Sequence, residues 1–416
     1  MQDKILINPG HISGKINAYP SKSYIQRALA LGLLNKQGIE IRNYKECSDS
    51  NSVLSSVKKL GAKVEVIDGN IKISGPENFK PFGINCKESG LCLRMFAPIL
   101  SLSDIEYKIK GTNQLLNRGN GYIPDILNML GVVCSSDDDC MYVKGPIKSG
   151  NILIENPSGS QLITGLMFAL SKVDGNSIIT IKNPVSFPYI KMTSELLNEF
   201  GADINITGNN KIIVSGNRSF TGGIIDIEGD WSSSAFYLVA GAISGQISVS
   251  ELSPSSLQPD DAILNYLKTA GAKVELKNNA VRVTKADLTG FEADIKDHPD
   301  LFIPLVILAL NCSGISRIHN YGRLKFKESD RPSVLVSELK KAGAKISAGK
   351  EFMRIEKSEL YYSVLDTHND HRMAMGFAVA ALNSVSGLEI NNTRCVNKSY
   401  PGFFGEFKNL ITEIRK

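Results

Sequence analysis

Hydrophobic residues along the chain fall into three kinds of segment that recur in the same order. Uninterrupted apolar stretches, such as 301–310, predict helices that are buried on most sides. Segments that alternate, such as 39–43, predict strands, and stretches with one apolar face, such as 48–62, predict amphipathic helices. Two further short strands, such as 63–67 and 71–75, follow. The pattern therefore predicts an α/β (α+β) protein built from β-α-β-α-β-β units.

A short phrase containing glycine marks the repeat. It reads LGAKVEV from Leu60, and related phrases return after 70 residues three times and then after 72. Each phrase is typical of a helix that stops at glycine and leads into a strand. The spacing exceeds the roughly 20–50 residues of solenoid repeats, so we expect each unit to be a small subdomain. The glycines are Gly61, Gly131, Gly201, Gly271 and Gly343.

The two ends of the chain complete one another in this scheme. A sixth buried helix opens at 370–383, but only one strand and a predicted helix at 401–414 follow it. The alternating segments 4–8 and 10–18 have no unit of their own, so we expect them to supply the missing strands. Six units then divide most simply into two lobes of three. The predicted lobes are residues 21–228 and residues 1–20 with 229–416.

Length and composition agree with a globular protein of two or three domains. The 416 residues are 42% hydrophobic and 21% charged. The longest apolar run is too short for a bilayer, which needs about 20 residues, and we see no signal-peptide pattern. Seven cysteines are scattered without a CxxC pair, which is typical of reduced thiols in a cytoplasmic protein. The net charge of +5 suits small anionic ligands and is too weak to predict nucleic acid.

Cations and small polar groups stand at or just before the predicted helix starts. A cation there opposes the helix dipole, at a cost of about 0.3–1 kcal/mol. A bound anion removes the cost, because backbone N–H groups and positive side chains both favour it. Recurrence in several units predicts an anion-binding face where the two lobes meet. The residues are Lys22, Ser23, Arg27, Arg94, Arg118, Ser160, Gln161, Ser186, Tyr189, Lys327, Arg331, His371, Arg372 and Lys398.

Simpler interpretations exist for single members of this set. Lys22 and Arg27 could face solvent, and the serines could be only N-caps. Asp300 is a plausible N-cap, and Glu328 could simply pair with Arg331 on the surface. However, a polyanion clamp gains nothing from two carboxylates among its cations. Proton transfer requires a general acid and a general base, so the two acids favour an enzyme.

The segment 368–375, HNDHRMAM, holds two of the five histidines and suggests a metal site. Catalytic zinc usually takes three protein ligands, and no third strong ligand is identifiable, so we expect no metal. Asn369 or Asp370 is then the cap of the sixth buried helix. His371 and Arg372 would project from its positive end toward the anion-binding face.

Six stretches together resemble a known family. They are PSKSYIQR (20–27), PVSFPYI (184–190), EGDWSSSAFYL (228–238), KFKESDR (325–331), NDHRMAM (369–375) and CVNKSYPGFF (395–404). They are similar to the signatures of the 5-enolpyruvylshikimate-3-phosphate synthase family, collinearly over nearly the whole chain. The resemblance implies a two-lobed enolpyruvyl-transferase fold of six units, with the active site in the cleft between lobes. It also implies metal-free transfer of the enolpyruvyl group of phosphoenolpyruvate to the 5-hydroxyl of shikimate 3-phosphate, releasing phosphate.

The resemblance assigns roles to matching positions. Asp300 would accept the 5-hydroxyl proton, Glu328 would help to protonate the methylene carbon, and Lys22 is a second proton-transfer candidate. Positions that match shikimate 3-phosphate contacts are Lys22, Ser23, Arg27, Ser160, Gln161, Ser186, Tyr189, Asp300, Arg323 and Lys327. Positions that match phosphoenolpyruvate contacts are Lys22, Gly90, Arg118, Gln161, Arg331, Arg372 and Lys398.

The chain departs from the family pattern in places. The loop 87–94, KESGLCLR, keeps Gly90 and Arg94 but has Glu88 where the family usually has Asn and Leu91 where it has Thr. A carboxylate beside an anionic substrate is unexpected, and it marks the chain as a divergent member. Further departures are Gln114 for Arg, Gly159 for Ser and Arg323 for Asn.

Two other functions compete with this interpretation. UDP-N-acetylglucosamine enolpyruvyl transferase shares the fold, but its reactive cysteine is missing from the corresponding loop 111–121. A non-catalytic anion- or RNA-binding scaffold would need aromatic side chains interleaved with basic ones, and we find no such stripe. We therefore expect a monomer that acts on two small-molecule substrates without a cofactor, a nucleic acid or a membrane.

Overall fold

Helices and strands alternate throughout the computed structural model, which describes residues 3–208 and 210–413. The chain divides into two compact units, which we call unit 1 (Met1–Tyr19 with Glu228–Lys416) and unit 2 (Pro20–Ile227). Residues 1–2, 209 and 414–416 of the predicted lobes, and the last residue of the predicted helix 401–414, lie outside the described residues. Within the described residues no helix is long and apolar enough to cross a bilayer.

The three sheets described in unit 2 share one pattern. In each, a central strand pairs in parallel with an incoming strand and antiparallel with the second strand of a hairpin. The first sheet takes its incoming strand from the far end of the unit. The strand orders are β14 (Gly223–Asp226), β3 (Ile39–Arg42), β5 (Asn70–Ser74), β4 (Lys63–Ile67); β6 (Ile84–Asn85), β7 (Glu106–Lys110), β9 (Cys140–Lys144), β8 (Val133–Ser136); and β10 (Asn151–Glu155), β11 (Asn176–Lys182), β13 (Lys211–Ser215), β12 (Ile204–Thr207).

Three apolar helices form the core of unit 2, as their sequences predict. They are α1 (Lys22–Leu34), α3 (Gly90–Leu100) and α6 (Gln161–Leu170), and nearly all their residues are buried. A Cβ on Gly165 would lie 2.5 Å from the carbonyl oxygen of Met95, so glycine lets α6 approach α3 closely. The remaining helices are α2 (Ser48–Lys59), α4 (Asn113–Leu116), α5 (Tyr122–Met129) and α7 (Phe187–Glu199).

The repeated glycine phrase is confirmed as a helix stop. All five glycines have positive φ, between 80° and 105°. At the first of them, the Gly61 N–H donates to the carbonyl of Lys58 and the Ala62 N–H donates to that of Val57, at 3.1 and 3.0 Å. This pair of bonds is the Schellman motif, which satisfies carbonyls left open at the helix end. The glycines are therefore needed for their left-handed conformation.

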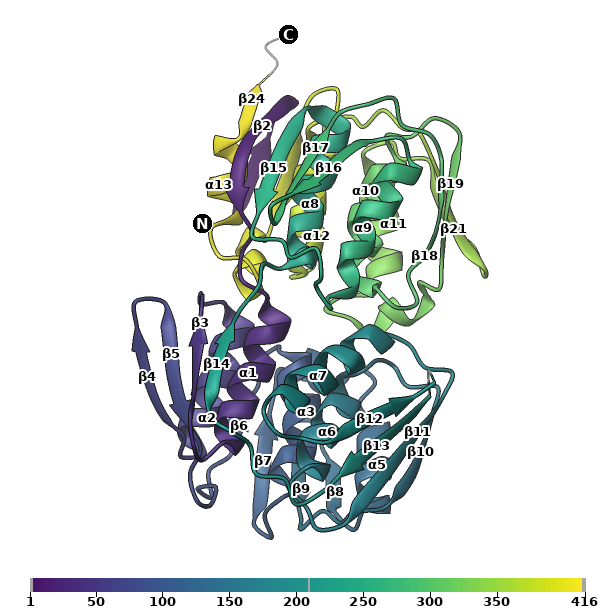
Figure 1. Cartoon of the computed structure of the whole chain (residues 1–416). Helices are drawn as coiled ribbons and strands as arrows, with labels where there is room; N and C mark the ends of the chain where they lie inside the picture. The colour runs from purple at the N-terminus through teal and green to yellow at the C-terminus, as the bar shows by residue number, and fades with distance from the viewer. Residues whose placement is uncertain (1–2, 209, 414–416) are drawn as a thin grey trace. The chain divides into compact units, whose positions relative to one another are not determined.

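Unit 1 contains strands from both ends of the chain. Strand β2 lies between β15 and β24 (Figure 1). Strand β1 pairs with β23, so the prediction that the N-terminal strands complete the C-terminal units is confirmed for these strands. The strand orders are β16 (Lys273–Lys277), β17 (Ala280–Thr284), β15 (Gln246–Ser250), β2 (Gly10–Asn17), β24 (Ile411–Glu413); β18 (Glu292–Asp294), β19 (Ile315–His319), β21 (Phe352–Glu356), β20 (Ile346–Ala348); and β1 (Lys4–Ile7), β23 (Leu388–Asn391), β22 (Val364–Asp366).

Three apolar helices also form the core of unit 1. They are α8 (Trp231–Ser244), α10 (Phe302–Ala309) and α12 (His371–Ala381), all fully buried. The other helices are η1 (Pro259–Ala262), α9 (Ile263–Thr269), η2 (Pro299–Leu301), η3 (Gly322–Phe326), α11 (Arg331–Lys341), η4 (Thr393–Lys398) and α13 (Phe403–Asn409).

The predicted helix 401–414 is too long. Its helical part, α13, ends at Asn409, and Ile411–Glu413 form strand β24 instead. The edge of β2 offers backbone groups that need partners, and pairing Ile12 with Ile411 satisfies them. A contact with the distant N-terminus thus overrides the local helical pattern.

Candidate active site

Lys22 stands at the first residue of α1 in unit 2, as predicted. Its Nζ lies 3.0 Å from Oδ2 of Asp49 on α2, and the Asp49 side chain is buried. This carboxylate offsets the unfavourable charge of Lys22 at the positive end of α1. Ser23 follows in the same first turn. The alternative that Lys22 is only a solvent-facing side chain is therefore wrong.

Arg27 is buried and ties three helices of unit 2 together. Its Nε donates to the Thr193 hydroxyl of α7 at 2.8 Å, and its Nη2 donates to the Thr164 hydroxyl of α6 at 3.4 Å. Its Nη1 donates to the carbonyl of Ser23 at 3.0 Å. Burial lowers the pKa of Arg27 to about 10, so the guanidinium stays charged at neutral pH. Tyr189, in the first turn of α7, lies beneath it, 5.9 Å from ring centroid to guanidinium.

The start of α3 is joined to that of α6 by a second arginine. Arg94 donates through Nη1 to Oε1 of Gln161 at 2.7 Å and through Nη2 to the carbonyl of Arg118 at 2.8 Å. A Cβ on Gly90 would lie 2.7 Å from that Nη1, which is too close. A larger residue at this position would therefore require the Arg94 side chain to move. Ser160 occupies the N-cap position of α6 directly before Gln161. The predicted residues Gly90, Arg118 and Gln161 are thus brought together through Arg94.

Ser186 has an unusual backbone conformation. It directly precedes α7 with φ of 54°, in the left-handed region that non-glycine residues seldom adopt. Pro188 then occupies an early position of the helix, where its missing N–H costs nothing. Such strained residues often lie at functional sites, and Ser186 stands only three residues before Tyr189.

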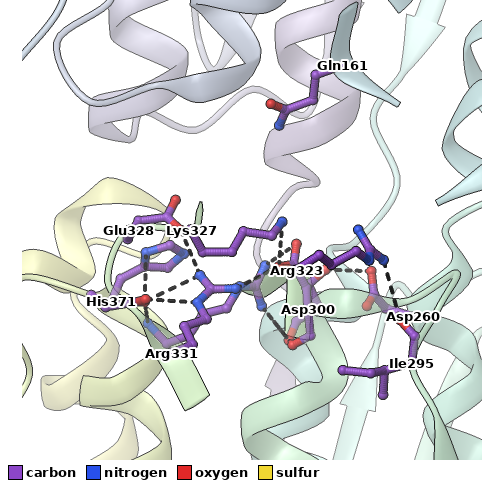
Figure 2. Close-up of polar contacts among 12 residues, drawn as sticks. Gln161, Asp260, Ile295, Asp300, Arg323, Lys327, Glu328, Arg331 and His371 are labelled. Atoms are coloured by element: carbon purple, nitrogen blue, oxygen red, sulfur yellow. Dashed lines mark hydrogen bonds and ion pairs between the residues drawn. The ribbon is translucent and has the colours of Figure 1, made fainter. Parts of the chain in front are cut away.

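In unit 1 a buried arginine binds three carboxylates from three separate segments. Arg331, the first residue of α11, is 1% exposed. Its Nε donates to Asp370 at 2.8 Å. Its Nη1 donates to Asp300 at 3.0 Å and its Nη2 to Glu328 at 2.9 Å (Figure 2). Burial by itself would lower the pKa of Arg331, but Asp370, Glu328 and Asp300 together raise it above its ordinary value. All three donor groups of the guanidinium are in use.

Two further cations lie close to the Asp300 carboxylate. Arg372 lies 3.0 Å from its Oδ2, and Lys327 lies 3.6 Å from its Oδ1. Burial favours the neutral carboxyl, but Arg372, Lys327 and Arg331 outweigh it and hold the pKa of Asp300 well below its usual range. The residue lies inside the 3-10 turn η2, whose N-cap position is held by His298. The simpler interpretation of Asp300 as an N-cap is therefore wrong.

Glu328 is shared between Arg331 and the last residue of η4. Nζ of Lys398 lies 3.4 Å from its Oε1, and both side chains are largely buried. We call Arg331, Asp300, Glu328, Asp370, Lys327, Arg372 and Lys398 the Arg331 cluster. Its four cations face three carboxylates, so the cluster carries one net positive charge. A ligand with several negative charges would find cations here that are already held in place.

Lys327 and Arg323 both come from the segment that leads into α11. Burial lowers the pKa of Lys327 to about 8, although Asp300 acts in the opposite direction. Arg323 in η3 donates through Nη2 to the carbonyl of Lys296 at 2.5 Å. The charge of Lys327 therefore changes close to neutral pH.

The segment 368–375 starts a helix. Asp370 is the N-cap of α12, and its Oδ1 accepts from the Arg372 N–H at 3.0 Å. His371 is buried, with Nδ1 3.8 Å from Oδ1 of Asp370. Within residues 3–208 and 210–413, no group of three or more His, Cys, Asp or Glu side chains is placed to hold a metal ion.

Sequence reasoning treated Asp370 only as a possible cap and missed its ion pair with Arg331. The two residues are 39 positions apart in sequence, so no local pattern joins them. The available signal was charge: a carboxylate stands directly before His371 and Arg372, at the start of a helix that was predicted to be buried. Asp370 also accepts from the hydroxyl of Ser329 at 3.2 Å, so it has a role beyond capping.

This arrangement provides the groups needed for proton transfer on an anionic substrate. Asp300 and Glu328 are held beside four cations, and each carboxylate keeps a different set of partners. A low-pKa carboxylate can become a base when an anion draws its cations away. Within unit 2, Lys22, Arg27 and Arg94 are each held near a helix start by their own partners.

Comparison with known proteins gives a consistent result. The model of the family EPSP synthase (3-phosphoshikimate 1-carboxyvinyltransferase) matches residues 7–407. The 3-phosphoshikimate 1-carboxyvinyltransferase of Brachyspira hyodysenteriae is 34% identical, with 99% of each chain covered. That of Clostridium kluyveri is 32% identical, covering 99% of this chain and 98% of the relative.

Solved structures share the fold. EPSP synthase from Acinetobacter baumannii superposes with a TM-score of 0.83 at 22% identity, covering 100% of this chain and 99% of that one. The enolpyruvyl transferase NikO from Streptomyces tendae gives 0.81 at 13% identity, covering 99% and 98%. The mixed α/β architecture is therefore the enolpyruvyl-transferase fold. The chain belongs to the EPSP synthase (3-phosphoshikimate 1-carboxyvinyltransferase) family.

Proposed function

We propose that the protein transfers the enolpyruvyl group of phosphoenolpyruvate to the 5-hydroxyl of shikimate 3-phosphate and releases phosphate. The observation that carries the proposal is the Arg331 cluster, where the carboxylates of Asp300 and Glu328 are held among cations. Both substrates carry phosphate and carboxylate groups, which require several cations, and the addition and elimination steps require a base and an acid. Membership of the family supports the same reaction.

Asp300 is the proposed base that accepts the 5-hydroxyl proton. In the free protein its negative charge is stabilised by Arg372, Lys327 and Arg331, which makes it a weak base. Anionic substrate groups would compete for these same cations. Each cation that turns to the substrate raises the pKa of Asp300, so substrate binding itself would make the base stronger.

Glu328 is the proposed acid that protonates the methylene carbon, and Lys22 is the second candidate for proton transfer. Glu328 is a carboxylate paired with two cations in the free protein, so it would first take up a proton when substrate anions draw these cations away. Glu328 is held by Arg331 at 2.9 Å and Lys398 at 3.4 Å, both of which are proposed phosphoenolpyruvate contacts. The proposed phosphoenolpyruvate set is completed by Lys22, Gly90, Arg118, Gln161 and Arg372. This placement keeps the acid beside the substrate that it would protonate.

Shikimate 3-phosphate is proposed to bind Ser23, Arg27, Ser160, Gln161, Ser186 and Tyr189 of unit 2, Asp300, Arg323 and Lys327 of unit 1, and Lys22. Because these groups come from both units, we propose that units 1 and 2 act as the two predicted lobes and that binding requires both. Exclusion of water from the tetrahedral intermediate would follow from their closure. No cofactor takes part in the proposed reaction.

The reaction itself is tested by phosphate release. We expect purified protein to liberate inorganic phosphate only when shikimate 3-phosphate and phosphoenolpyruvate are both present. A coupled colorimetric phosphate assay measures this. Release with UDP-N-acetylglucosamine in place of shikimate 3-phosphate, and none with shikimate 3-phosphate, would assign the protein to the other enolpyruvyl transfer reaction.

Replacing Glu328 by Gln tests the acid. The variant keeps the shape of the side chain but cannot donate a carboxyl proton, so we expect kcat to fall by about 100-fold or more. Shikimate 3-phosphate affinity, measured by calorimetry, should change less than about threefold, since Lys327 and the unit 2 contacts remain. Glu292→Gln, which alters an exposed carboxylate paired with Arg317 in the same unit, is the control. Loss of binding with unchanged kcat would contradict the acid role.

The lowered pKa of Lys327 predicts that kcat/KM for shikimate 3-phosphate depends on pH. The pKa of Lys327 is about 8, so its charge is present below pH 8 and is lost above it. Because kcat/KM reports groups of the free enzyme, kcat/KM for shikimate 3-phosphate should fall about tenfold per pH unit above 8. The substrate phosphate, with a second pKa of about 6, stays dianionic across this range.

Lys327→Arg is the matched variant for this profile. A guanidinium keeps its charge to above pH 12, so the decline should move out of the range between pH 7.5 and 9.5. Identical profiles for the wild type and Lys327→Arg would show that another group causes the decline.

A further inference from the structure

Behind the Arg331 cluster lies a buried carboxylate that the proposed reaction does not use. Glu338, on α11 two turns after Arg331, is 3% exposed. Its Oε1 and Oε2 both accept from Nζ of Lys341 at 2.7 Å, and Oε2 also accepts from the Asp366 backbone N–H at 3.0 Å. The ring Nε2 of His368 lies 3.4 Å from Oε1. A surface ion pair alone would leave Glu338 exposed like Lys341, which is 50% exposed.

The contacts of Glu338 fall on a strained turn. His368 and Asn369 have φ of 49° and 58°, two successive non-glycine residues in the left-handed region. Such residues persist where their surroundings hold them in place. The Asp370 N–H closes the turn on the carbonyl of Thr367 at 2.9 Å. Directly after it come Asp370, which binds Arg331, and Arg372, which binds Asp300.

Asp366, whose backbone N–H contacts Glu338, connects the turn to a third segment through its own carboxylate. Oδ1 of Asp366 accepts from the His368 N–H at 2.6 Å and from Nδ2 of Asn392 at 3.1 Å. Asn392 precedes η4, the turn that ends at Lys398. The hydroxyl of Thr367 donates to the carbonyl of Asn392 at 3.1 Å. Glu338 and Asp366 therefore join the three segments that carry Arg331, Arg372 and Lys398.

We propose that Glu338 is a positioning residue that sets the phosphoenolpyruvate cations through the turn 366–370. It fixes α11 to the Asp366 N–H and the His368 ring, and so fixes the start of α12 relative to Arg331. The inference rests on the proposed function, because it assigns Arg331, Arg372 and Lys398 to phosphoenolpyruvate. It adds a residue that touches neither substrate in this scheme.

Two variants of Glu338 and one control test the proposal in steady-state assays. Glu338→Ala removes every contact, so KM for phosphoenolpyruvate should rise about tenfold while KM for shikimate 3-phosphate changes less than twofold. Glu338→Gln keeps an oxygen for the Asp366 N–H but loses the charge, so the rise should be about threefold. Lys341→Met removes only the exposed partner and should leave both KM values within 1.5-fold.

A purely structural role would give a different result. It would lower the thermal-unfolding midpoint of Glu338→Ala while both KM values of the folded enzyme stay within twofold, or raise both equally. Either result would overturn the proposal. If Glu338→Ala does not fold, the near-isosteric Glu338→Gln decides in the same way. A selective rise in KM for phosphoenolpyruvate supports the positioning role, and no such rise overturns it.

Amide hydrogen exchange separates this inference from the proposed function, because it requires no turnover. In Glu338→Gln, peptides covering 366–372 should exchange several-fold faster than in the wild type, while peptides of α10 should not change. Unchanged exchange in 366–372 would overturn the positioning role even if the enzyme is active. An inactive wild type with faster exchange in the variant would instead refute the proposed reaction and leave the link between Glu338 and the turn supported.

Discussion

Burial of one guanidinium among three carboxylates organises unit 1. A buried arginine is tolerated only when its charge is matched and its donors are used, because desolvation otherwise costs several kcal/mol. Arg331 meets both conditions through Asp300, Glu328 and Asp370, which come from η2, the segment before α11 and the start of α12. Removing one carboxylate would leave a buried guanidinium donor without its partner, so the three segments are held in one arrangement.

The same interaction explains how one group of residues can serve both structure and catalysis. In the free protein, Asp300 and Glu328 are the counter-ions that keep Arg331 buried. In the proposed reaction, an anionic substrate would supply replacement charge, and the two carboxylates would then be released for proton transfer. The energy of substrate binding is then used partly to change the pKa of the base. Within unit 2, Arg27 and Arg94 join the helices α1, α3, α6 and α7.

Much of the fold could be predicted because its signals are local. Apolar runs gave the six buried helices, and the glycine phrase gave the ends of the amphipathic helices, since a left-handed residue is needed at each stop. The strand at 411–413 was missed because its partner, β2, lies some 400 residues earlier. Local periodicity carries no information about such an edge.

The candidate site could also be predicted only in part. Cations at helix starts could be read from the sequence, because a charge at a positive helix end is visible from position alone. The carboxylates that pair with these cations could not be read from the sequence. Asp49 beside Lys22, Asp370 beside Arg331 and Asp300 among three cations are known only from the folded chain. The interpretation of Asp300 as a helix cap failed for this reason: a carboxylate near a helix start has several uses, and distant cations decide between them.

The most direct test of this account is a crystal structure of the Glu328→Gln variant with shikimate 3-phosphate and phosphoenolpyruvate, in which turnover is slowed. The account predicts that oxygens of phosphoenolpyruvate lie within hydrogen-bond distance of Arg331, Arg372 and Lys398, and that the 3.0 Å contact between Arg331 and Asp300 lengthens or breaks. Phosphoenolpyruvate bound away from these cations, with that contact unchanged, would contradict it.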